Sequence, residues 1–314
     1  MTATTPATSP VATAARGVAG AGESAARPPG EPRLVGYLYV LPAFAVFACF
    51  VLYPLGKAAW ISLWDWDGLT VATWAGLSNY TDIFSDDELQ AAFGHALVLL
   101  VFYAVLPLLI GLLLAGLMAR ARVRGLAFFR TILFLPQVIA LVVVAVMWKM
   151  IYDPDNGALN RTLGWFGIEG KSWLGDFSLA LPSIGFVGTW LYFGLAMVLL
   201  TAGVQKIPAS LYDAARVDGA GPFREFLAVT LPGLRGEIAV SLTLTTIYAL
   251  RNFDLVYITT RGGPGDATTV PAFQVFSRAF ESGQVGSAAA VGITLTLVIF
   301  LISLGINRLA ERGT

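Results

Sequence analysis

The feature that most constrains this chain is a set of six long apolar stretches that contain almost no charge. A hydrocarbon layer about 30 Å thick is crossed by a helix of roughly 20 residues. Together the stretches hold three charged residues, Lys149, Arg251 and Asp254. The stretches are residues 37–56, 96–118, 131–152, 181–204, 238–260 and 288–306. We therefore predict an all-α integral membrane protein with six transmembrane helices.

The composition agrees with a membrane environment and argues against several other classes of protein. Hydrophobic residues make up 56% of the chain and charged residues only 13%, whereas a soluble domain is about 25% charged. The formal net charge of +0 offers no electrostatic footprint for nucleic acid. One cysteine and one histidine exclude a disulfide framework and argue against a metal centre.

The distribution of basic residues predicts the orientation in the membrane. Residues 1–36 are rich in Ala, Thr, Pro and Gly and are predicted to form a disordered cytoplasmic tail. If the N-terminus is cytoplasmic, the inner segments carry 13 Lys and Arg residues and the outer segments carry five. Cytoplasmic loops of membrane proteins are enriched in Lys and Arg. Both termini are therefore predicted to be cytoplasmic.

The second and sixth stretches carry small residues at regular spacing. Gly111, Ala115 and Ala119 recur every four residues, and so do Ala288 and Gly292. Small residues at this spacing let helix backbones approach closely in a membrane. We interpret these faces as helix-packing surfaces.

The segment YDAARVDGAGPFREFLAVTLP (212–232) interrupts the apolar pattern between the fourth and fifth stretches. Pro208 can start a helix that ends at Gly219 or Gly221, and Pro222 opens a second helix that stops near Pro232. Its balanced charge argues against a DNA-reading helix-turn-helix. We predict a cytoplasmic loop, residues 205–237, with two short helices that dock a soluble partner. The apolar residues it displays are Leu211, Phe223 and Phe226.

The stretch GWFGIEGKS (164–172) ends like a phosphate-binding loop but does not satisfy that pattern. The motif G-x-x-x-x-G-K-[ST] requires glycine where Trp165 stands. The predicted topology also places this stretch outside, away from cytoplasmic ATP. The chain is therefore not expected to be an enzyme. Any ATPase that drives it must be another polypeptide.

Polar residues in the fifth stretch are candidates for a translocation pathway, because a charge at a helix centre costs roughly 2.5–3.5 kcal/mol unless it faces the bundle interior or water. Arg251 and Asp254 are three residues apart, so they either neutralise each other as a structural pair or line the pathway. Tyr248, Arg251, Asn252 and Leu255 would share one face of a helix. Such a polar and aromatic wall suits sugar hydroxyls and ring C–H groups.

Three separated groups of motifs resemble those of the binding-protein-dependent ABC importer permeases with a MetI-like transmembrane domain. Asp213-Ala214-Ala215-x-x-Asp218-Gly219-Ala220, followed by Phe226 and Leu231-Pro232, is similar to the family's "EAA" loop, with Asp213 where glutamate is usual. FDLVYITTRGGPGDATT (253–269) resembles the fifth-span signature of the maltose-type, carbohydrate-uptake branch. YLYVLPAFAVF, LYPLGKAAWISLWDWDG and GLSNYTDIF resemble that branch's first span and following outer segment, so the resemblance runs from about residue 34 to the end.

The resemblance implies a permease subunit in the plasma membrane of a prokaryote. Its implied partners are a second homologous permease, nucleotide-binding ATPase subunits that hold ATP with Mg, and an extracytoplasmic solute-binding protein that delivers a sugar or oligosaccharide. The loop would couple to the ATPase, and Gly262, Gly263 and Pro264 would lie near the docking surface for the binding protein. The implied coupling residues are Asp213, Ala214, Ala215, Asp218, Gly219, Ala220, Phe226 and Pro232.

Other functions are compatible with parts of the sequence. An ion-gradient-driven secondary transporter would use ionisable residues near the membrane centre and often has repeated halves, whereas this chain has a single Arg/Asp pair and no visible repeat. A non-transporting membrane scaffold would not need Arg251 or Asp254. An importer of glycerol phosphate or a polyamine remains open, because a few pocket side chains decide the cargo.

Overall fold

The computed structural model describes residues 33–120 and 125–311. The chain forms two compact units, Met1–Tyr53 and Pro54–Thr314. The described part of the first unit is helix α1 (Arg33–Phe47) followed by the π-helical turn η1 (Ala48–Leu52). Most of the predicted tail lies outside the described residues, and its last four residues already belong to α1.

Four helices of the described chain are long and apolar enough to cross a membrane: Tyr37–Ile61, Asp87–Leu117, Ala180–Val204 and Val285–Glu311. Two bent helix pairs meet the same criterion jointly. They are Ala127–Val138 with Leu141–Ile151, and Pro222–Gly233 with Arg235–Thr259. The predicted helical membrane fold is therefore confirmed, with four spans, or up to six if each bent pair is one span.

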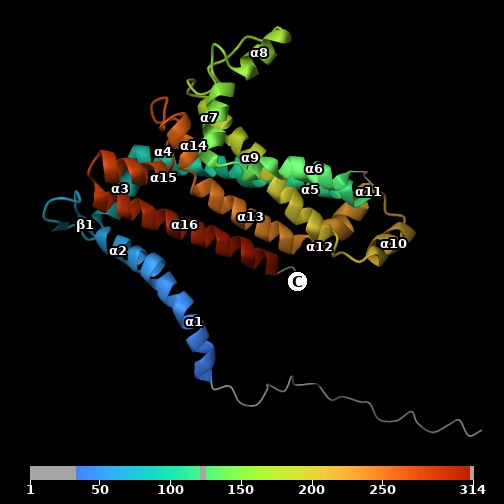
Figure 1. Cartoon of the computed structure of the whole chain (residues 1–314), viewed down its shortest axis with the longest axis horizontal. Helices are drawn as coiled ribbons and strands as arrows, with labels where there is room; N and C mark the ends of the chain where they lie inside the picture. The colour runs from blue at the N-terminus through green and yellow to red at the C-terminus, as the bar shows by residue number, and fades with distance from the viewer. Residues whose placement is uncertain (1–32, 121–124, 312–314) are drawn as a thin grey trace, which may run out of the picture. The chain divides into compact units, whose positions relative to one another are not determined.

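The second unit begins with a short helix and a hairpin that lead into the second apolar stretch (Figure 1). These elements are α2 (Tyr53–Ile61), β1 (Trp64–Asp65), β2 (Thr73–Trp74) and α3 (Ser78–Ser85). The strands pair antiparallel, with Trp64 opposite Trp74. The side chain of Asp86 then caps a long helix by accepting hydrogen bonds from the backbone N–H groups of Glu88 and Leu89. That helix comprises α4 (Asp87–Leu100), the π-helical turn η2 (Val101–Val105) and α5 (Leu106–Arg120).

The third apolar stretch contains a corner. Helix α6 (Leu126–Phe134) and the 3₁₀ turn η3 (Leu135–Val138) meet α7 (Leu141–Ile151) at 95°. Pro136 has no backbone N–H with which to continue the helix, and Ile139 adopts an extended backbone conformation after it. The structure thus bends the span expected over residues 131–152. Helix α8 (Ala158–Trp165) follows in the connecting segment.

Helix α9 (Ala180–Val204) is the most buried of the candidate spans, with 67% of its apolar window inside the unit. It packs along α5 and also contacts α6. A Cβ added at Gly111 of α5 would lie 2.9 Å from the Cβ of Ala196 on α9, and Ala115 is fully buried in the same interface. The predicted packing face is therefore confirmed at Gly111 and Ala115. The side chain of Ala119 lies outside the described residues.

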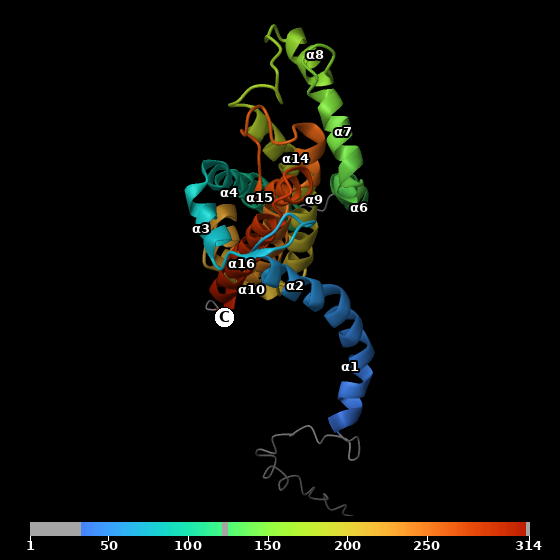
Figure 2. The ribbon, with the colours of Figure 1, turned by 90° about the vertical axis from the view of Figure 1, so that its left-hand side faces the viewer.

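The segment after α9 consists of short helices, which lead into the last two apolar stretches. The short elements are α10 (Ala209–Val217), α11 (Pro222–Glu225), the π-helical turn η4 (Phe226–Thr230) and α12 (Leu231–Gly233). They are followed by α13 (Arg235–Leu250), α14 (Asp254–Thr259), α15 (Pro271–Phe276), the π-helical turn η5 (Ser277–Glu281) and α16 (Val285–Glu311). Helix α13 packs against α9 and α16 (Figure 1), while α15 packs against α4 and α16 (Figure 2).

We expect Gly188→Ala to destabilise the second unit. A Cβ at Gly188 of α9 would lie 2.0 Å from Cε2 of Tyr103, so the substitution overpacks two buried helices at a cost of about 1–3 kcal/mol. The measurement is the Tm of the purified full chain in detergent. Gly236→Ala on α13 is the control, since an added Cβ there meets no heavy atom within 4 Å. Equal Tm values for the two variants would contradict this packing.

Candidate functional site

Helices α10 and α11 are joined by a small charged cluster around Arg216. Its Nη1 donates to Oδ1 of Asp213 and its Nε donates to Oε2 of Glu225, each at 3.3 Å. Glu225 is buried, so this contact ties the second short helix to the first. Gly219 lies between the helices with a φ of +77°, a conformation that favours glycine, whereas Gly221 has a φ of −70°. The bend expected at one of these two glycines is made at Gly219.

The predicted coupling residues fall on this segment but do not all face outward. Leu211 and Phe223 expose 51% and 75% of their surface, as the prediction of displayed apolar residues requires. Phe226 differs, because it is only partly exposed and its ring lies 3.3 Å from a Cβ added at Gly116 of α5. The prediction that Phe226 is displayed is therefore corrected: it packs behind the segment. The remaining predicted residues lie on α10, its following turn and α12: Asp213, Ala214, Ala215, Asp218, Gly219, Ala220 and Pro232.

The fifth apolar stretch breaks where its polar residues lie. Helix α13 ends at Leu250 and α14 begins at Asp254, so Arg251 and Asn252 belong to neither helix. The expected common face with Tyr248 is therefore wrong, because the helix does not continue. Arg251 is exposed, and in the described part of the chain it forms no ion pair with Asp254. The structure thus lacks the neutralising pair that the spacing suggested.

Tyrosine rings and one amide from three parts of the chain meet beside this break. Tyr248 of α13 stacks on Tyr192 of α9 with ring centroids 5.0 Å apart and planes 9° apart, and Tyr192 also lies 5.3 Å from Tyr103. Asn252 is only 8% exposed, and its side chain interacts with the hydroxyl of Tyr103, although its Nδ2 makes no hydrogen bond of normal geometry among the described residues. Tyr103 and Tyr192 were not among the predicted site residues, because their only signal in the sequence is a tyrosine inside an apolar stretch.

The loop after α14, residues 261–270, is held from within the unit. The hydroxyl of Thr268 donates to the carbonyl of Gly263 at 2.8 Å, and Nδ1 of His95 lies 2.9 Å from the carbonyl oxygen of Thr269. Gly262 is buried, while Gly263 and Pro264 are partly exposed. Of the three predicted contact residues, only Gly263 and Pro264 are accessible to a partner in this conformation.

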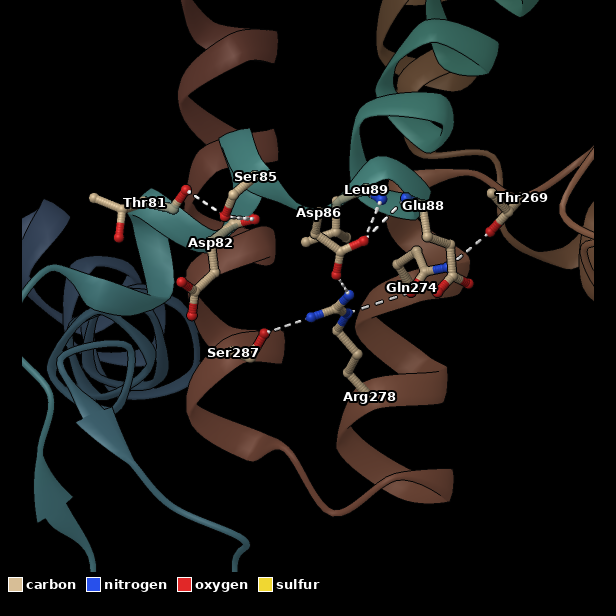
Figure 3. Close-up of polar contacts among 10 residues, drawn as sticks. All are labelled: Thr81, Asp82, Ser85, Asp86, Glu88, Leu89, Thr269, Gln274, Arg278 and Ser287. Atoms are coloured by element: carbon tan, nitrogen blue, oxygen red, sulfur yellow. Dashed lines mark hydrogen bonds and ion pairs between the residues drawn. The ribbon is translucent and has the colours of Figure 1, made fainter.

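A polar network continues from this loop to the start of α4 (Figure 3). Gln274 of α15 is 2% exposed, and its Nε2 donates to the hydroxyl of Thr269 at 3.0 Å and to the carboxylate of Glu88. Its Oε1 accepts from Nε of Arg278 at 3.4 Å. One buried amide therefore joins the loop, the second span and the turn η5.

Arg278 completes the network through a largely buried ion pair. It binds Asp86 through Nη2 and donates from Nη1 to the hydroxyl of Ser287 on α16 at 2.9 Å. Burial raises the pKa of the Asp86 carboxyl, but hydrogen bonds from Arg278, Leu89 and Glu88 and the Arg278 charge outweigh it, so that its pKa lies below the usual range. Asp86 is thus charged at neutral pH and joins the cap of α4 to the start of α16.

Neither a phosphate loop nor a metal centre is formed in the described residues. The Gly-Lys-Ser stretch after α8 is a turn closed by Asn160, which accepts from the backbone N–H of Lys171 at 3.1 Å and donates to its carbonyl at 2.9 Å. In the described ranges, no three His, Cys, Asp or Glu side chains come together as metal ligands.

We expect two substitutions of Asp86 to separate its roles as cap and as ion-pair partner. Asp86→Asn keeps a good cap but removes the charge opposite Arg278, whereas Asp86→Ala also removes the cap and should cost about 0.5–2 kcal/mol more. The Tm of the full chain in detergent should therefore fall in the order wild type, Asn, Ala. In a double-mutant cycle with Arg278→Gln, strictly additive effects would show that the pair does not interact.

Comparison with known proteins gives a family match and relatives of similar length. Residues 107–314 match the family described as "Binding-protein-dependent transport system inner membrane component". The chain is 33% identical to the diacetylchitobiose uptake system permease protein NgcF of Streptomyces coelicolor, over 86% of this chain and 81% of NgcF. It is 31% identical to the sn-glycerol-3-phosphate transport system permease protein UgpA of Yersinia pestis, over 92% of this chain and 98% of UgpA.

A solved structure shares the fold. The chain superposes with a TM-score of 0.76, at 22% identity, on a chain of a bacterial ABC transporter involved in the import of the acidic polysaccharide alginate. The match covers 89% of this chain and 96% of the other. At this identity the likeness concerns the arrangement of helices alone.

Proposed function

Because the chain belongs to the family of binding-protein-dependent transport system inner membrane components, we propose that it is one of two permease subunits of an ATP-driven importer in a prokaryotic plasma membrane. Each bent helix pair then contributes one span, and Pro222–Gly233 of the second pair stays on the cytoplasmic side. This makes six spans, with both termini cytoplasmic. The chain itself hydrolyses nothing. A separate ATPase subunit binds ATP with Mg, a second homologous permease completes the pathway, and an extracytoplasmic solute-binding protein delivers the solute.

The observation that carries this proposal is the form of the α10–α11 segment. It displays Leu211 and Phe223 to the outside while Arg216 and the buried Glu225 hold its two helices together. Exposed apolar side chains on a braced, rigid element are typical of a docking surface. We propose that this segment fits into the ATPase subunit and that Asp213 and Asp218 make polar contacts at the rim of that interface.

The proposed cargo is a sugar or oligosaccharide. The stacked rings of Tyr192 and Tyr248 offer flat apolar faces, and the amide of Asn252 beside Tyr103 offers a donor to a hydroxyl group. The family relative NgcF is named for diacetylchitobiose uptake, which supports a carbohydrate. The relative UgpA is named for sn-glycerol-3-phosphate transport, and the exposed Arg251 keeps a phosphate-bearing cargo as the second candidate.

We expect Gly219→Pro to abolish solute uptake in cells while membrane abundance stays normal. Proline fixes φ near −65°, which is incompatible with the φ of +77° at Gly219, so the bend between α10 and α11 is lost. Gly221→Ala is the matched control, because Gly221 has a negative φ and an added Cβ meets no atom within 4 Å. Normal uptake by the Gly219→Pro variant would refute the coupling role.

We expect Asn252→Leu and Tyr248→Leu each to reduce sugar uptake about 3- to 10-fold at normal abundance. The first removes a hydrogen bond worth about 0.5–1.5 kcal/mol, and the second removes the stacked ring. Tyr248→Phe is the control, since it keeps the ring and should retain most of the uptake. The measurement is uptake of labelled oligosaccharides and of labelled glycerol 3-phosphate.

Two outcomes of that experiment would change the proposal. Unchanged uptake in both leucine variants would mean that this wall does not touch the cargo. Uptake of glycerol 3-phosphate alone, abolished by Arg251→Gln, would replace the sugar with the phosphate-bearing cargo.

A further inference from the structure

A large cavity of about 1040 Å³ lies between α5, the end of α9 and the α10–α11 segment. Sites for small molecules commonly have volumes of about 300–1,000 Å³, so this cavity can hold a sizeable ligand. It is distinct from the tyrosine cluster, because Tyr103, Tyr192 and Tyr248 do not line it. The proposed function assigns nothing to it.

One wall of the cavity belongs to a lipid-facing surface. Leu109, Leu113 and Leu117 lie one turn apart on α5, line the cavity and expose 55%, 63% and 59% of their surface. They belong to a helix that is apolar enough to cross a membrane. Phe226 closes the far side against Gly116. One wall of the cavity is therefore an exposed apolar face of a candidate membrane span.

The other end of the cavity is polar and contains an arginine without a described partner. Arg216 is already bound by Asp213 and Glu225 at 3.3 Å each. Arg130 of α6 also lines the cavity, and its Nε is buried with no hydrogen-bond partner and no ion pair among the described residues. Arg130 is partly exposed as a residue, but a buried N–H such as its Nε is costly unless an acceptor group satisfies it. Arg130 is therefore a ready site for an anion.

We propose that this cavity binds one phospholipid, with its phosphate at Arg130 and an acyl chain along Leu109, Leu113 and Leu117. The apolar wall suits an acyl chain, and Arg130 suits a phosphate head group. Basic pockets between membrane helices bind lipid head groups in this way. The charged side chains in the lining are Arg130, Asp213, Arg216 and Glu225, which sum to zero.

The test compares two photoreactive lipids with the same diazirine-bearing acyl chains, a phosphatidylglycerol and a diacylglycerol that lacks the phosphate. Each is added at equal mole fraction to the full chain in maltoside detergent, and labelled peptides are identified by mass spectrometry. We expect phosphatidylglycerol to label both the α5 peptide and the α11–η4 peptide about tenfold more than diacylglycerol does. A tenfold ratio corresponds to about 1.4 kcal/mol, close to the lower end of the roughly 1.5–3 kcal/mol of a hydrogen bond to a charged group.

Two arginine variants sharpen the result. Arg130→Gln should bring labelling by phosphatidylglycerol down to the diacylglycerol level, while Arg224→Gln should leave it unchanged, because Arg224 is exposed on α11 and does not line the cavity. If Arg130→Gln lowers the stability of the chain, the comparison of the two lipids on the wild-type chain still tests the proposal, because it needs no variant.

Three results would overturn the proposal. Equal labelling by the two lipids would mean that the phosphate is not recognised. Labelling confined to α5, without α11 or η4, would identify ordinary lipid around the helix. Loss of labelling when the chain is assembled with a second permease or an ATPase would assign the cavity to a protein partner. None of these results bears on solute uptake, so the lipid site and the importer function are tested separately.

Discussion

The arrangement of the second unit depends on how closely other helices approach α9. Gly188 leaves room for the ring of Tyr103, and a Cβ at Gly194 would lie 2.1 Å from the carbonyl oxygen of Leu133. In a membrane the hydrophobic effect does not drive helices together, because lipid is as apolar as the helix surface, so close van der Waals contact at small residues has to do so. These contacts also place Tyr192 of α9 against its aromatic neighbours.

The break after Leu250 is the second feature that organises the unit. Irregular backbone at membrane depth leaves N–H and C=O groups without helical partners, and it is tolerated only where protein buries it or a wet cavity receives it. The same break buries Asn252 beside Tyr103 and leaves Arg251 exposed. The break in the helix and the proposed contact between Asn252 and the cargo therefore have the same cause.

Helix α5 connects the proposed coupling segment to both the protein core and the membrane. One side of the helix, at Gly111 and Ala115, packs on α9, while Leu113 lines the cavity behind α10 and α11. Phe226 rests on the same helix at Gly116. With a phospholipid in that cavity, the surface proposed to meet the ATPase would be supported by lipid as well as by protein, so that coupling would depend on membrane composition.

The sequence alone was sufficient to predict helices in a membrane, close packing at Gly111 and a bend at Gly219 or Gly221. The length of an apolar stretch, the spacing of small residues and the position of a glycine each act over a few neighbouring residues. The sequence did not predict the corner after Pro136 or the end of α13 at Leu250, although both lie inside apolar stretches. The ion pair expected between Arg251 and Asp254 assumed an unbroken helix. Packing against other spans determines whether that helix continues. The contact between Tyr103 and Tyr192 likewise forms only when helices distant in sequence pack together. No pattern within either span predicts which residue the ring will contact.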